Sequence, residues 1–152
     1  MKVFLVRHAK AGDRVRWTKP DHIRPLTEAG LRQAEALVSQ LADLRIERVI
    51  SSRYVRCVQT VQPLATALGL SVETDDALAE GAGLDETLAL FASLDRPAAM
   101  STHGDVLENV IGHLQGAGVP GADARLGKKG STWVLDLEGG DVTAGTYLEP
   151  PA

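Results

Sequence analysis

The stretch KVFLVRH, residues 2–8, decides the fold because a continuous apolar run stops abruptly at an arginine and a histidine. A short apolar run without alternation is typical of a strand buried on both faces of a sheet. RVISS at 48–52 and AAMSTH at 98–103 have the same form, since each ends in polar residues. The sequence therefore predicts buried strands whose carboxyl ends carry polar side chains.

Helical patterns alternate with these strands. Apolar residues recur at helical spacing in 26–44, and Thr27 is a plausible N-cap for this helix. A second helix is expected at 54–69, closed by Gly69 and kinked or split by Pro63. Further helices are expected at 84–95 and 105–118, a further strand at 70–76, and loops at 9–25 and 119–130. Residues 131–148 predict two strands joined in a hairpin at 138–141.

This order of elements predicts an α/β fold. Strands that alternate with helices form a mainly parallel sheet with helices on both faces, which is a three-layer sandwich. No internal repeat or linker interrupts the pattern, so residues 1–152 are expected to form a single domain.

Composition excludes several classes of function. The formal net charge of −4 argues against general nucleic-acid binding. Cys57 is alone, so no intrachain disulfide can form. No apolar segment approaches the ~20 residues of a membrane helix, and no secretory signal is recognisable at the N-terminus. We therefore expect a cytoplasmic protein without membrane partners, and no oligomeric state is predicted.

The ends of the strands predict a binding site. In open α/β sheets, ligands bind beyond the carboxyl ends of the strands. A single histidine or arginine at the end of a strand is ordinary. A protein with a net negative charge, however, has no general reason to gather several cations at one edge of its sheet. Guanidinium groups match the geometry of phosphate, and a histidine among them can carry a phosphoryl group. The residues concerned are Arg7 and His8 after the first strand, Ser51 to Arg56 after the second, and His103 after the fourth.

Three motifs in combination resemble those of the histidine phosphatase superfamily, which has the phosphoglycerate mutase-like fold. They are LVRHA at 5–9, SSRYVRCVQT at 51–60 and STHGD at 101–105. Ala9, the short chain and RPLTEAG at 24–30 are similar to the small SixA-type phosphohistidine phosphatases. KKGSTWVLDL at 128–137 is also similar to the phosphatase domain that follows a Nudix domain in some actinobacterial hydrolases.

The resemblance implies a role for each matching residue. His8 matches the nucleophile that becomes phosphorylated, and Arg7 matches its neighbour in the phosphate pocket. Arg56 matches the motif arginine, and His103 matches the second histidine, which contacts the phosphoryl group. Gly104 follows it as a further substrate-binding candidate. The resemblance implies no cofactor, and no cluster has metal-ligand spacing.

Other candidates have two interpretations each. Glu80 is placed to protonate the leaving group, or it is a solvated loop residue. Ser51 binds phosphate or ends its strand, and Arg53, outside the motif, contacts substrate or is exposed. Asp105 orients His103 or caps its helix, and we favour the cap. The loop cations Lys10, Arg14, Arg16, Lys19 and Arg24 are either solvated or form a basic rim that attracts anions.

The sequence therefore predicts a metal-independent phosphatase that acts through a phosphohistidine on His8. Its substrate is expected to be a phosphohistidine protein, or a small phosphomonoester or nucleotide. A mutase is disfavoured because the short chain has no long insertion to close the site. The alternative is a non-catalytic module that recognises phosphate as a sensor or adaptor.

Overall fold

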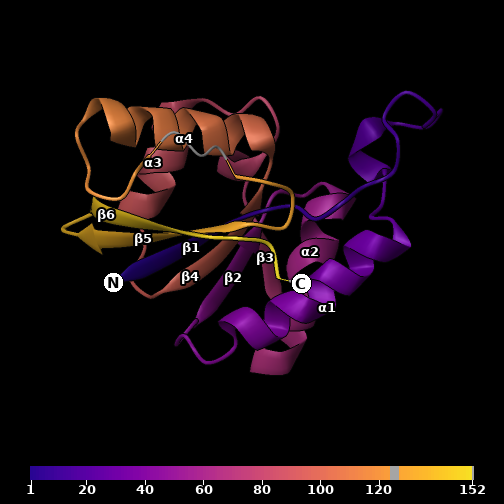
Figure 1. Cartoon of the computed structure of the whole chain (residues 1–152), viewed down its shortest axis with the longest axis horizontal. Coiled ribbons are helices and arrows are strands. Elements are labelled where there is room, and N and C mark those ends of the chain that lie inside the picture. The colour runs from indigo at the N-terminus through magenta and orange to yellow at the C-terminus, as the bar shows by residue number, and fades with distance from the viewer. Residues whose placement is uncertain (124–126, 152) are drawn as a thin grey trace.

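The computed structural model describes residues 1–123 and 127–151, and these residues form one six-stranded sheet with helices on both faces (Figure 1). Residues 124–126 of the expected loop at 119–130 lie outside the described residues. The strands are β1 (Lys2–Arg7), β2 (Arg48–Ser51), β3 (Val72–Thr74), β4 (Ala98–Thr102), β5 (Thr132–Glu138) and β6 (Asp141–Leu148). The helices are α1 (Glu28–Leu41), α2 (Val55–Leu68), α3 (Leu84–Ala92) and α4 (Gly104–Gly116), with short 3₁₀ turns η1 (Asp21–Ile23) and η2 (Asp76–Leu78).

The strand order is β3-β2-β4-β1-β5-β6. The first four strands of the chain are parallel, whereas β5 runs antiparallel to β1 and β6 antiparallel to β5. The predicted hairpin is confirmed, because Gly139 and Gly140 join β5 to β6 with φ values of 59° and 87°. Two residues with positive φ match the right-handed twist of the strands that they connect.

The packing of β1 in the core explains why its sequence is an unbroken run of apolar residues. Val3 and Leu5 face the layer that contains α3 and α4, whereas Phe4 and Val6 face the layer that contains α1 and α2. Successive side chains of a strand point to opposite faces, so both faces of β1 are buried. Figure 1 shows the two helix pairs on opposite sides of the sheet, which confirms the predicted α/β sandwich.

Local signals set the ends of the helices. The side chain of Thr27 accepts a hydrogen bond from the Gly30 amide, as expected for the N-cap of α1. Gly69 ends α2 in the left-handed conformation, with a φ of 69°. Pro63 does not split α2, because packing of Val61 and Leu64 on the sheet holds the helix across the missing amide. None of the helices in the described residues is long and apolar enough to cross a membrane.

Several expected elements differ in detail. The strand expected at 70–76 is shorter and runs into η2, and η1 lies within the stretch expected to be a loop at 9–25. Short 3₁₀ turns have no apolar periodicity of their own, so the sequence pattern did not indicate them.

Gly30 allows the chain after His8 to lie directly on the first turn of α1. The Lys10 carbonyl accepts a hydrogen bond from the Thr27 amide, and a Cβ at Gly30 would overlap that carbonyl oxygen.

We predict that Gly30→Ala lowers the free energy of unfolding by about 1–3 kcal/mol. The matched control is Gly112→Ala in α4, where a Cβ meets open space. Higher helix propensity should raise its stability by about 0.5–1 kcal/mol. Urea unfolding measures both, and equal effects of the two variants would contradict the packing argument.

Candidate active site

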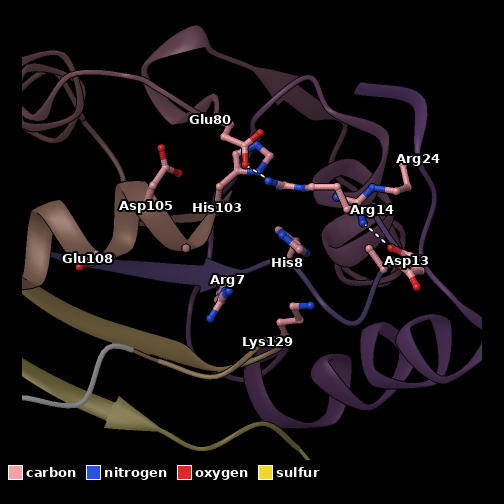
Figure 2. A pocket seen from close by; sticks show the side chains of 13 residues that line it. Arg7, His8, Asp13, Arg14, Arg24, Glu80, His103, Asp105, Glu108 and Lys129 are labelled. Carbon is pink, nitrogen blue, oxygen red and sulfur yellow. Dashed lines mark hydrogen bonds and ion pairs between the residues drawn. The ribbon is translucent and has the colours of Figure 1, made fainter. Parts of the chain in front are cut away.

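A cavity of about 530 Å³ lies beyond the carboxyl ends of β1 and β4. His8 lies at its centre in Figure 2, with His103 and Glu80 on one side and Arg7 and Lys129 on the other. The edge of the sheet therefore carries the cavity, as the parallel topology predicts. The residues that line it are Arg7, His8, Ala11, Gly12, Asp13, Arg14, Arg24, Glu80, His103, Gly104, Asp105, Glu108 and Lys129.

The side chain of His8 is oriented by one hydrogen bond. Its Nδ1 lies 2.8 Å from the carbonyl oxygen of Ala9. A carbonyl oxygen only accepts, so Nδ1 carries the proton and donates it. In the neutral ring, Nε2 is then left with a free lone pair. Ala9 is itself fixed, because its amide donates to the Thr60 hydroxyl at 2.9 Å.

His8 is neutral at ordinary pH. Burial, joined by the charges of Arg56, His103 and Arg7, lowers the pKa of His8 to about 3, against the hydrogen bond to Ala9, which raises it. Burial and neighbouring cations both disfavour an imidazolium ion. The arrangement therefore holds a neutral imidazole with an available lone pair in a cavity that contains cations.

His103 follows β4 and is almost completely buried. The His103 and His8 rings meet edge to face, with centroids 5.6 Å apart. Nε2 of His103 lies 2.8 Å from the Ser52 hydroxyl, and its Nδ1 lies 3.5 Å from Nη2 of Arg56. Because a guanidinium group only donates, Nδ1 is the unprotonated nitrogen and Nε2–H donates to Ser52. Burial, followed by the charge of Arg56, lowers the pKa of His103 to about 4.

Arg7 ends β1 and reaches into the cavity. Its Nη1 donates to the Gly127 carbonyl at 2.9 Å, whereas its Nε has no hydrogen-bond partner. The guanidinium group lies against Gly104, where a Cβ would come within 2.8 Å of Nη2. Gly104 therefore makes room for Arg7, and it lines the cavity beside His103.

Arg56 lies behind His103 and is completely buried. Asp21 neutralises it, because Nη1 donates to the Asp21 carbonyl and Nη2 to its carboxylate, each at 3.0 Å. The same carboxylate accepts from Nε of Arg24 at 3.0 Å. Burial of Asp21 opposes ionisation, but its bonds to Arg24 and Arg56 prevail and hold its pKa below the usual value. Arg56 thus sets the electrostatics of both histidines from behind the cavity wall.

Three of the predicted substrate contacts do not line the cavity: Arg56, which lies behind its wall, Ser51 and Arg53. The Ser51 hydroxyl is buried and donates to the Ser52 carbonyl at 2.6 Å. Arg53 is exposed, and its Nε lies 3.6 Å from the Asp76 carboxylate. The serine that reaches the site is Ser52, because side chains alternate along the strand and only its hydroxyl points at His103.

Glu80 lines the cavity but is already engaged. Its Oε1 accepts a hydrogen bond from Arg14 at 2.8 Å, and its Oε2 lies 3.6 Å from Nη2 of Arg56. Asp105 supports the same loop, since its carboxylate accepts from the Gly81 amide at 2.8 Å. The expectation that Asp105 is a helix cap is wrong, because His103 is the N-cap of α4. Asp105 instead positions the loop that carries Glu80.

Asp21 and Lys129 were not among the site residues predicted from the sequence. Asp21 has a recognisable signal only in hindsight, as an acid three residues before Arg24. Lys129 lies in a loop far along the chain, and no local pattern indicates that it faces His8. Of the loop cations, Arg14 and Arg24 line the cavity, and each is paired with a carboxylate, Arg14 with Glu80 and Arg24 with Asp21. In the described part of the chain, no group of three or more His, Cys, Asp or Glu side chains is arranged to hold a metal ion.

Comparison with known proteins agrees with this geometry. The family model of the histidine phosphatase superfamily, branch 1, matches residues 3–96. An 8-oxo-(d)GTP phosphatase from Mycolicibacterium smegmatis is 36% identical over 155 residues, which cover 98% of this chain and 48% of the relative. The chain thus spans about half the length of that relative.

Solved structures with the same fold include SixA proteins. SixA from Agrobacterium tumefaciens superposes with a TM-score of 0.80 at 26% identity, over 98% of each chain. A protein histidine phosphatase SixA complexed with tungstate superposes with a TM-score of 0.79 at 22% identity. That match covers 97% of this chain and 94% of the other and shows the shared fold.

The two buried histidines predict a loss of stability in acid. Their pKa values in the folded chain, about 3 and about 4, lie below the ordinary 6.5, so the unfolded chain binds more protons between these limits. The free energy of unfolding should therefore fall as pH drops from about 6.5 toward 4, by up to about 1.4 kcal/mol per pH unit for each histidine.

Urea unfolding at pH 7, 6 and 5 measures this slope. His8→Asn should reduce it by about half, since one of the two groups is removed. His113→Gln, at an exposed histidine of α4, controls for the loss of a histidine as such. An unchanged slope in His8→Asn would contradict the assignment of a neutral buried imidazole.

Proposed function

The chain belongs to the histidine phosphatase superfamily, and from this premise we propose that it is a metal-independent phosphatase acting through a phosphohistidine on His8. One observation carries the proposal: the neutral, buried imidazole of His8 donates from Nδ1 to Ala9 and leaves Nε2 free. A module that only binds phosphate needs donors and positive charge, and gains nothing from a deprotonated nitrogen.

The proposed reaction has two displacements. In the first, the Nε2 lone pair attacks phosphorus, an N–P bond forms, and the leaving group departs with the electron pair of its bond to phosphorus. In the second, water attacks the phosphohistidine, the N–P bond breaks, and its electron pair returns to Nε2. The leaving group and the released phosphate together take up the protons of the water.

The surrounding residues supply charge and orientation. Arg7 lines the cavity, and its guanidinium group would donate to the phosphoryl oxygens. A phosphoryl dianion near His103 favours the protonated ring, because an opposite charge nearby stabilises an imidazolium ion. The positive charge of the ring would then act on the phosphoryl oxygens. Arg56 would act on both histidines through its charge, from its position against Asp21.

Two classes of substrate are compatible with the proposed phosphatase. The mycobacterial relative, named for its action on 8-oxo-(d)GTP, supports a small phosphorylated molecule such as a nucleotide. The SixA structures share the fold, which supports a phosphohistidine protein. Neither class needs a strong general acid if the departing atom is weakly basic, and Glu80 is already bound by Arg14. A parallel assay with a phosphohistidine protein, nucleoside phosphates and a sugar phosphate ranks these substrates by kcat/KM.

Trapping the intermediate tests the proposed mechanism. After rapid quenching with ³²P-labelled substrate, the wild type should carry label that is labile to acid and stable to alkali. His8→Ala should lose the label and at least about 10³-fold in kcat, because the nucleophile is gone. His113→Ala is the matched control and should retain both. An unchanged turnover in His8→Ala would refute the mechanism, and phosphate binding without turnover in the wild type would favour the sensor or adaptor.

A further inference from the structure

We propose that Lys129 forms a second anion subsite, so that the preferred substrate is a diphosphate whose terminal phosphoryl group lies at His8 and whose inner phosphate binds Lys129. This inference rests on the proposed function, and it selects one substrate chemistry for the same cavity.

The loop that carries Lys129 is tied to the backbone of the nucleophile. The Gly130 amide donates to the carbonyls of Arg7 and His8, at 3.1 and 3.2 Å. The Arg7 amide donates to the Ser131 carbonyl at 3.0 Å. These bonds directly follow Lys129, and the Gly127 carbonyl before it accepts from Nη1 of Arg7 at 2.9 Å, so the backbone of the lysine is held at a fixed position relative to His8. A binding residue on such a support loses little freedom when a ligand arrives.

Lys129 is a cation without a carboxylate partner in the described part of the chain. Arg14 is paired with Glu80, Arg24 with Asp21, and even the adjacent Lys128 with Glu149. Burial, followed by the positive charges of Arg7, Arg24, Arg14 and Lys10, lowers the pKa of Lys129. An amine held among cations gains more from an anionic ligand than one already paired.

The size of the cavity fits a ligand larger than one phosphate. A phosphate ion fills on the order of three water volumes, ~100 Å³, whereas the cavity measures about 530 Å³. In Figure 2, Lys129 lies on the side of His8 opposite to Glu80 and His103, on the wall that also carries Arg7. A second phosphate can therefore lie on the cationic wall while the first lies in the cavity at Nε2 of His8.

The chemistry of a diphosphate suits these contacts. Nε2 of His8 attacks the terminal phosphorus, the bond to the bridging oxygen breaks, and that oxygen keeps the electron pair. It becomes a terminal oxygen of the departing monophosphate, which is far less basic than an alkoxide. Lys129 would stabilise the charge that develops there. The phosphohistidine is then hydrolysed by water, as in the general reaction.

Paired substrates test the subsite. ADP and AMP serve as probes because they share a nucleoside and differ by one phosphate, and phosphate release is measured for each. Lys129→Met should raise KM for ADP about tenfold, the loss expected for one charge-assisted hydrogen bond, and should change kcat/KM for AMP less than about twofold. Lys129→Arg should retain most of the ADP activity. Lys128→Met is the matched control, because that lysine does not line the cavity.

The outcomes separate the subsite from the proposed function. Equal losses with ADP and AMP would place Lys129 in the phosphoryl pocket and overturn the inference, as would the absence of any effect. A binding measurement does not depend on turnover. By calorimetry, His8→Ala should bind inorganic pyrophosphate more tightly than inorganic phosphate, and adding Lys129→Met should abolish this preference. If labelling shows no phosphohistidine while the preference persists and depends on Lys129, the mechanism fails and the subsite stands. No preference for pyrophosphate refutes the subsite.

Discussion

The pairing of β1 on both edges is the constraint on which the site depends. β4 pairs with it in parallel and β5 in antiparallel fashion, and the pairing continues past the end of the strand. The His8 amide donates to the Thr102 carbonyl, and the Arg7 amide to the Ser131 carbonyl, each at 3.0 Å. Backbone bonds therefore join Arg7 and His8 to the strand before His103 on one side and to the loop of Lys129 on the other. The elements that build the cavity share one rigid frame.

The second constraint is electrostatic, since the frame brings buried cations close to two imidazole rings. A buried guanidinium such as that of Arg56 is costly unless it is paired and hydrogen-bonded, and Asp21 meets this need from the loop after β1. Burial and the positive charge nearby lower the pKa values of both imidazoles, so both rings stay neutral. The same feature that would prepare His8 for the proposed attack therefore weakens the fold in acid, because neither ring readily accepts a proton while the chain is folded.

Much of this arrangement was predictable from the sequence, because it depends on local patterns. The apolar run of β1, the cap at Thr27 and the glycine turn at 139–140 each correspond to one physical requirement. The convergence of His8 and His103 followed from the topology of parallel strands. The residues that were missed depend on chain geometry that has no periodic signal. Lys129 faces His8 because the Gly130 amide bonds to the backbone at the end of β1. Ser52, and not Ser51, contacts His103, because successive side chains point to opposite faces of the sheet.

The position of Glu80 bears on which substrates the cavity favours. Arg14 donates to one oxygen of this carboxylate, and Asp105 holds the next residue, Gly81, so a leaving group must compete with Arg14 for that oxygen. A general acid contributes most when the departing oxygen is a strongly basic alkoxide. It contributes little when the departing atom belongs to a phosphate or an imidazole. Under the proposed mechanism, the contacts of Glu80 would disfavour sugar phosphates, and the proposed subsite at Lys129 would stabilise a leaving group that is itself anionic.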